Sequence, residues 1–240
     1  MRQGKKTARR TTLGLFCVGI VLMTGLLAGC SLWSQPQPQP QPQPPGPVGQ
    51  KDFTAQNDAL KQLFPAKSGF IWAYDGFAEY SHMMELKAVS LTDGQTVYTV
   101  AGEIGDPSGG EAKFDLSLAL TYTIKEGVLL QNKTAPRMMD TFAAIELLRG
   151  PLNVQSQWEQ KTRDASGKEY QLVCTITEIK EEKGLKTYTI EYKDKNSDFY
   201  EKRQIRQGSG IVFFEKKIRL NNEPIEMGYY LYEEASGYRK

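Results

Sequence analysis

The fold class is decided by the stretch FDLSLALTYTI, which runs from Phe114 to Ile124. Six large apolar side chains alternate there with small or polar ones over eleven positions. Successive side chains of a β-strand point to opposite faces, so this period of two predicts a strand with one face on a core and the other towards water. The same alternation recurs in residues 170–176 and 188–192, and it places Cys174 on an inner face.

Short turn signals separate the alternating runs, and Asp93-Gly94, Glu126-Gly127 and Lys183-Gly184 are the clearest of them. Strands joined by such short turns pair with their sequence neighbours, which predicts an antiparallel meander. Ahead of the strands, apolar residues at helical spacing predict a short helix within Asp52–Leu63, ended by Pro65.

The second half of the chain repeats the pattern of the first half. Five matches keep their order with an offset between about 83 and 90 positions, as expected for two copies of one supersecondary unit. The matched features are Pro65/Trp72 with Pro151/Trp158, Glu79-Tyr80 with Glu169-Tyr170, Tyr98-Thr-Val with Tyr188-Thr-Ile, 114–130 with 199–214, and 138–148 with 227–233. Because the last segment is β-prone in its second copy, we interpret Phe142–Leu148 as a strand.

We therefore expect an all-β body, an antiparallel meander of ten or more strands built from two tandem similar units. The units are residues 51–148 and 149–240, packed as one body. A sheet that wide curls or splits, so a curved half-barrel, a barrel and a sandwich all remain open. About 190 residues are enough to bury a core without disulfides.

The first thirty residues carry an export signal. Five basic residues precede an apolar run from Leu13 to Leu27, and small residues lead to Cys30. Leu27-Ala28-Gly29-Cys30 resembles the lipobox of bacterial lipoproteins. The resemblance implies that residues 1–29 are removed and that Cys30 carries a diacylglyceryl group. It implies a cell-membrane, extracytoplasmic location, with the lipid as the only attached group. An uncleaved helical anchor is the alternative, although the run is short for a membrane span.

Residues 30–50 form a linker after the lipidated cysteine. Seven of the twelve prolines lie between Gln35 and Pro47 in a Gln-Pro alternation, which favours an extended spacer of about 40 Å. Removing 1–29 leaves 25 basic against 28 acidic residues. Such a balance lacks the basic footprint that nucleic-acid binding requires.

A second resemblance concerns the start of the body. The string Pro65-x3-Gly69-x2-Trp72-x-Tyr74 is similar to the opening of a group of uncharacterised β-rich lipoproteins from Gram-positive bacteria. The resemblance implies an extracellular β-rich domain and no particular activity. In the second copy Gln155 stands where the first has Gly69.

No catalytic or metal constellation is evident, and we expect a non-enzymatic protein without a cofactor. His82 is the only histidine, and Cys174 on an inner face is typical of packing rather than of a nucleophile. The acids near one another in sequence, Asp75, Glu79 and Glu85, are the weak candidates for a carboxylate hydrolase. Trp72, Tyr74 and Trp158 are candidate binding aromatics for a sugar or peptide, with core packing as the alternative.

These features favour a tethered binding module at the cell envelope, with an envelope protein or wall polymer as its partner. The alternative is a carrier that holds a lipid or another hydrophobic ligand in an apolar cavity. Such a cavity would be lined by Leu116, Leu118, Leu120 and Tyr188. The sequence does not define the oligomeric state.

Overall fold

The computed structural model describes residues 52–135, 138–221 and 223–239, which belong to one compact unit, Gln50–Lys240. The predicted signal peptide, the lipidation site Cys30 and the Gln-Pro linker lie outside the described residues. Among the residues that are described, no helix is long and apolar enough to cross a membrane.

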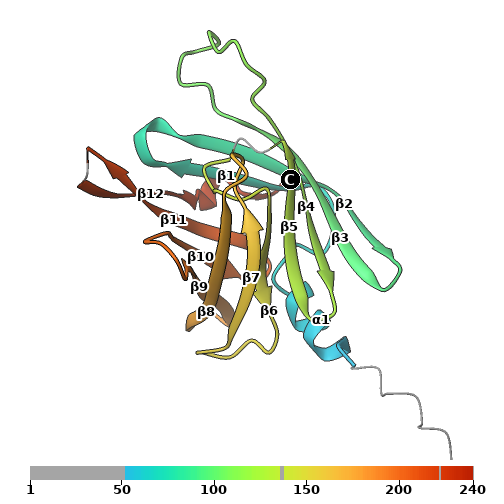
Figure 1. Ribbon diagram of the computed structural model, residues 1–240. Helices are drawn as coiled ribbons and strands as arrows, with labels where there is room; N and C mark the ends of the chain where they lie inside the picture. Colours follow the sequence, from blue (N-terminus) through green and yellow to red (C-terminus); the bar gives the residue numbers. More distant parts are fainter. Residues whose placement is uncertain (1–51, 136–137, 222, 240) are drawn as a thin grey trace, which may run out of the picture. The chain divides into compact units, whose positions relative to one another are not determined.

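Thirteen antiparallel strands form one curved sheet, as the all-β prediction required (Figure 1). Along the sheet the order is β6-β5-β4-β3-β2-β1-β12-β11-β10-β9-β8-β7, and β13 pairs with β1. The strands are β1 (Phe70–Gly76), β2 (Ser81–Thr92), β3 (Gln95–Ile104), β4 (Ser117–Lys125), β5 (Val128–Ala135), β6 (Ala144–Arg149), β7 (Gln157–Arg163), β8 (Glu169–Glu182), β9 (Leu185–Asp194), β10 (Tyr200–Arg206), β11 (Gly210–Leu220), β12 (Glu223–Leu231) and β13 (Gly237–Tyr238). Short 3-10 turns, η1 (Phe77–Glu79) and η2 (Glu233–Ala235), follow β1 and β12.

Two runs of six strands, β1–β6 and β7–β12, are each a meander of sequence neighbours. The Asp93-Gly94, Glu126-Gly127 and Lys183-Gly184 turns have positive φ at both residues, between 51° and 77°. That backbone matches the twist of the flanking strands, which is why these pairs close two-residue hairpins. The ladder between β2 and β3 shifts at Leu86/Ala88, and the ladder between β8 and β9 shifts at Ile176/Glu178, 90 positions later. Descent from a duplicated unit stays a prediction.

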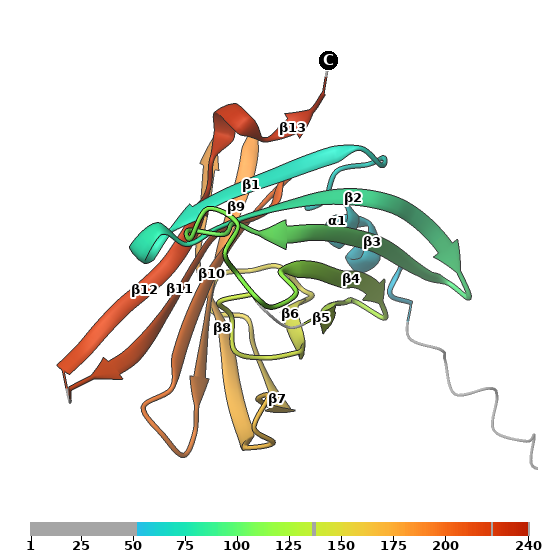
Figure 2. The same cartoon turned by 90° about the horizontal axis from the view of Figure 1, so that it is seen from above.

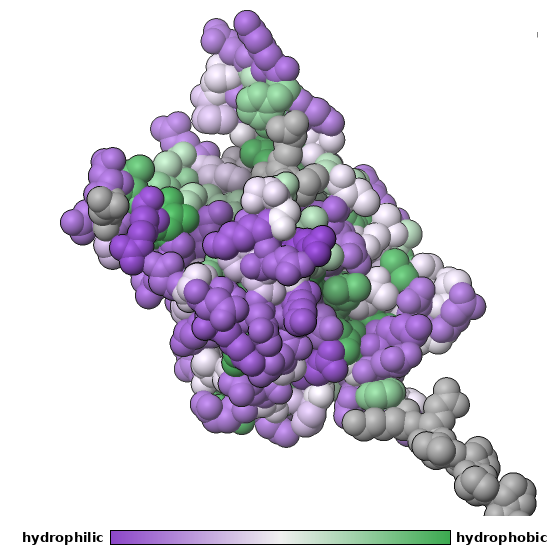
Figure 3. All heavy atoms as spheres, viewed as in Figure 1, coloured by the Kyte–Doolittle hydropathy of each residue, from purple (hydrophilic) through white to green (hydrophobic). Residues whose placement is uncertain are grey.

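The first and last long strands meet in the middle of the sheet, where β1 pairs with β12 (Figure 2). The sheet curls until its two end strands, β6 and β7, face each other, so it is a nearly closed barrel-like sheet. Of the architectures left open by the sequence, this is the barrel. Figure 3 shows a largely hydrophilic outer surface on one side, with hydrophobic residues in small separate patches.

The barrel interior is filled by the inward side chains of both runs, and α1 (Thr54–Lys61), close to the expected helix, adds Leu60 to the same core. Leu60, Leu63 and Phe64 are buried, and the Phe64 ring packs against Tyr98 and Tyr122 at 5.0 and 4.7 Å between centroids. Because each buried aliphatic or aromatic side chain contributes about 1.5–3 kcal/mol, this core is the main source of stability.

Two predicted strand bounds are wrong by a few residues. β4 begins at Ser117 rather than Phe114, since Asp115 accepts hydrogen bonds from the Ser117 N–H and hydroxyl and holds a local turn. Phe114 is consequently 58% exposed. β6 begins at Ala144 rather than Phe142, and Phe142 makes only an isolated bridge to Asp164.

Candidate functional site

The three candidate binding aromatics are buried in the core. Trp72 and Tyr74 are each 2% exposed and Trp158 is 6% exposed. The Trp72 indole N–H donates to the Ser209 carbonyl at 2.6 Å, and the Tyr74 hydroxyl donates to the Ile211 carbonyl at 2.7 Å. The Trp72 and Tyr74 bonds hold β1 against the β10–β11 turn and β11. Since all three rings are buried, the structure favours core packing over an exposed binding platform.

His82 and Cys174 lie in separate surroundings. The His82 ring stacks on Tyr74 at 4.4 Å and meets the edge of Tyr229 at 4.8 Å, and neither ring nitrogen has a hydrogen-bond partner among the described residues. Burial lowers the pKa of His82 to about 3, so the ring is neutral. Burial likewise raises the pKa of the Cys174 thiol to about 12. A thiol with so high a pKa and an imidazole with so low a basicity do not make an activated nucleophile–base pair.

The hydrolase candidates are not brought together around a cleft. Asp75 and Glu79 are exposed, and Glu85 forms an ion pair with Lys87. In the described part of the chain no group of three or more His, Cys, Asp or Glu is placed to hold a metal ion.

A buried ionic network inside the barrel was not predicted from the sequence. Lys133 and Arg203 both bind Asp140, at 2.6 and 3.3 Å, and Arg203 also binds Glu201 at 2.9 Å. All four side chains are at most 1% exposed. The Arg203 guanidinium lies 4.9 Å from the ring centroids of both Tyr192 and Phe214, a cation–π sandwich.

The network holds residues 139–141, which precede β6, against the barrel interior. The Thr141 N–H donates to Glu201 at 2.9 Å, and Lys216 donates to the Met139 carbonyl at 2.6 Å. Burial alone would raise the pKa of Asp140, but Lys133 and Arg203 offset that effect and hold it below its usual range. Two fully buried cations therefore balance two buried anions, and the network links β5 and β10 to the segment before β6.

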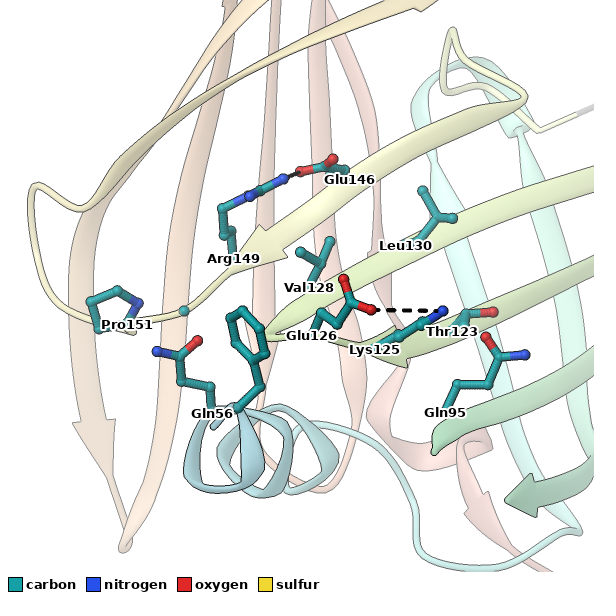
Figure 4. Close-up of a pocket in the computed structure, with 12 residues that line it drawn as sticks. Gln56, Gln95, Thr123, Lys125, Glu126, Val128, Leu130, Glu146, Arg149 and Pro151 are labelled. Carbon is teal, nitrogen blue, oxygen red and sulfur yellow. Dashed lines mark hydrogen bonds and ion pairs between the residues drawn. The ribbon is translucent and has the colours of Figure 1, made fainter. Parts of the chain in front are cut away.

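Two hollows lie on the outer surface of the described part of the chain. One, which we call the helix groove, has a volume of about 550 Å³ and lies between the start of α1 and the outer face of β4–β6. Its apolar floor consists of Phe53, Val128, Leu130 and Pro151. Figure 4 shows Val128 and Leu130 between two ion pairs, Lys125–Glu126 and Glu146–Arg149.

A second hollow of about 700 Å³, the seam groove, lies between the end strands and is lined by Ala143–Glu146 and Glu159–Asp164. Leu130 and Glu146 line both grooves, so the two adjoin along β5 and β6. The two grooves together combine an apolar floor, flanking ion pairs and strand edges.

Sequence reasoning missed this surface because its residues come from six separate elements, α1 and β3–β7. The outward alternation of Val128 and Leu130 against the inward Leu129 and Gln131 was a readable signal. The sequence did not indicate which strands form the two ends of the sheet.

Comparison with known proteins leaves the function open. No family model and no curated protein matches the sequence. Among solved structures, the chain is similar to a candidate lipoprotein from Parabacteroides distasonis ATCC 8503, with 13% identity and a TM-score of 0.39. It is also similar to a candidate exported protein with a YmcC-like fold from Bacteroides fragilis NCTC 9343, with 10% identity and a TM-score of 0.42. Each match covers 70% of this chain and 96% of the other.

Proposed function

We propose that this protein is a lipid-anchored, extracytoplasmic binding module of the cell envelope that performs no catalysis. The basic start, apolar run and Leu27-Ala28-Gly29-Cys30 support export and lipidation at Cys30. The packed interior and the compensated charges around Arg203 support a body that is rigid rather than reactive.

The pair of adjoining grooves on the outer surface carries the binding proposal. They combine an apolar floor at Val128 and Leu130 with charged rims, and they lie next to strand edges that can pair with a partner. A protein partner of the envelope fits this mixture better than a wall polymer, since a polyanion requires a surface of excess positive charge.

The packed interior of the barrel gives little support to the alternative function, a carrier of a hydrophobic ligand. It requires an open apolar cavity lined by Leu116, Leu118, Leu120 and Tyr188. Leu118, Leu120 and Tyr188 are only 2%, 3% and 6% exposed and belong to the packed core, and the half-buried Leu116 lies before β4.

Capture from envelope fractions tests the binding proposal. The chain from Ser31 onward, which lacks the lipidation cysteine, is compared with Leu130→Asp in the grooves and with Leu91→Asp. Leu91 is 74% exposed and lies at the β2–β3 turn. We expect one set of partners to be retained by wild type and Leu91→Asp and lost by Leu130→Asp. Equal capture by all three chains would contradict the proposal.

Membrane attachment is tested separately by Cys30→Ala in the full chain. We expect this variant to leave the membrane fraction. Continued tight membrane retention would show that an apolar helix, and not a lipid, holds the protein.

A further inference from the structure

The two ends of the sheet face each other but are not joined by a strand ladder. In the described sheet β6 pairs only with β5, and β7 pairs only with β8. The strands are consecutive in sequence, linked by residues 150–156, so a direct hairpin pairing was available to them. At the far end of the gap a single backbone bridge joins Phe142 to Asp164. The edges of β6 and β7 therefore lie opposite each other, and the ladder is broken between them.

Side chains occupy the places that a peptide backbone would fill. The Gln160 carboxamide accepts from the Glu146 N–H at 2.8 Å and donates to the Glu146 carbonyl at 2.8 Å. The Thr162 hydroxyl donates to the Ala144 carbonyl at 2.8 Å. A carboxamide has the same donor and acceptor as a peptide group, so Gln160 satisfies the β6 edge as one residue of a neighbouring strand would.

The gap beside these side chains is hollow. The seam groove is lined by consecutive residues of both end strands, Ala143–Glu146 and Glu159–Asp164. Consecutive residues line a space only when backbone edges, and not one face of a strand, form its walls. The six residues of β6 span about 20 Å, and the Phe142 bridge and the 150–156 connection bound the gap at its ends.

We propose that the seam groove binds a short extended peptide of a partner protein, which adds as a strand between β6 and β7. This inference rests on the proposed binding function and names its partner chemistry. The peptide displaces the Gln160 carboxamide from the Glu146 backbone and from the Cys174 thiol, to which its N–H group also donates at 3.2 Å. The end strands then move apart to the spacing of about 10 Å that an inserted strand needs. Recognition by main-chain hydrogen bonding at a sheet edge is an established mode of peptide binding.

The walls of the groove define the sequence of this peptide. Three of the five charged residues that line the groove are already paired, Glu146 with Arg149, Glu159 with Lys195 and Arg163 with Glu169, so most of the lining favours uncharged side chains. Lys161 and Asp164 also line it and form no ion pair among the described residues. A strand inserted between two edges needs N–H donors on both sides. A Gln-Pro repeat such as residues 35–47 has donors on one side only, because successive N–H groups of a strand point to opposite edges. The partner segment is therefore free of proline and rich in β-branched residues.

Fluorescence anisotropy with a defined probe tests the proposal on the chain from Ser31 onward. The probe is a Thr-Val-Thr-Val-Thr-Val peptide that carries fluorescein on its N-terminus and an amide at its C-terminus, and its counterpart is N-methylated at each valine. We expect the methylated peptide to bind about tenfold more weakly, since it cannot donate on one edge. Gln160→Leu removes the internal competitor, and we expect it to bind the unmethylated probe about fivefold more tightly.

Gln157→Leu is the matched control, because Gln157 lies on β7 but bonds to the Thr175 hydroxyl and not to β6. It should bind the probe like wild type. In parallel, amide exchange at Glu146 should slow on adding peptide to Gln160→Leu, a readout independent of affinity.

Three results would overturn the inference. One is an absence of binding to both wild type and Gln160→Leu at about 1 mM peptide. Another is equal binding of the methylated probe. The third is a Gln160→Leu chain that dimerises in analytical ultracentrifugation and no longer accepts peptide, which would assign the edges to a second copy. If peptide binding fails while envelope capture still depends on Leu130, only the seam inference falls.

Discussion

Replacing His82 by Phe should remove a pH dependence of folding that this one side chain causes. The ring is 2% exposed, and its nitrogens have no hydrogen-bond partner among the described residues. Burial lowers its pKa from 6.5 to about 3, against a smaller opposite effect of Asp140. Between these values the unfolded chain binds a proton that the folded chain does not, so the free energy of unfolding rises with pH.

The size of the effect follows from the same two values. Between pH 7.5 and pH 5.0 the unfolded state gains the proton, whereas the folded state stays neutral. At about 1.36 kcal/mol per pKa unit, wild type loses about 2 kcal/mol of stability over this interval. His82→Phe keeps the ring packing against Tyr74 and Tyr229. The variant should therefore not show this histidine-dependent loss of stability between pH 7.5 and pH 5.0.

Urea unfolding of the chain from Ser31 onward, followed by tryptophan fluorescence at the two pH values, measures this difference. Subtracting the variant from wild type cancels the contributions of the carboxylates. A difference between the two chains below about 0.5 kcal/mol would refute the argument. So would an NMR titration in which this single histidine protonates near pH 6.5 in the folded protein.

Two further predictions concern other buried groups. Arg203→Met leaves Asp140 and Glu201 without their shared cation, and should cost about 3–5 kcal/mol in urea unfolding. Arg163→Met, which breaks only an exposed pair with Glu169, should unfold like wild type, and an equally stable Arg203→Met would contradict a stabilising role of the buried network. Cys174, with its pKa raised by burial to about 12, should resist a thiol reagent at pH 8 until denaturant unfolds the chain. Rapid labelling of the folded protein would show that the β8 inner face opens.

Local pattern was sufficient for the fold class, and the hairpins show why. Asp93-Gly94 and Lys183-Gly184 specify a turn through backbone preference alone, and the alternation in 170–176 correctly placed Cys174 inside. Strand ends were less well defined. The apolar Phe114 continued the alternation, but the Asp115 side chain competed for the backbone and delayed β4 until Ser117.

The features that could not be predicted from the sequence are polar side chains whose partners lie on other segments of the chain. Arg203 and Lys133 follow the inward alternation of Ile205 and Leu129, but a charged residue in such a pattern is ordinarily assigned to the outer face. Only the opposing charge of Asp140, from another segment, makes their burial favourable. Gln160 gave no local signal either, since its hydrogen bonds depend on the Glu146 backbone of the preceding strand, β6.

The β1–β12 pairing gives the order of synthesis a physical meaning. Each six-strand run can form from neighbouring hairpins while the chain is being synthesised. β1 can pair with its second neighbour, β12, only after the end of the chain has been made. Until then the N–H and C=O groups along one edge of β1 are unpaired and can bond to strands of other chains, which leads to aggregation. A chain that lacks Glu223–Leu231 therefore leaves the β1 edge open to aggregation, whereas the finished chain covers that edge with its own last strands.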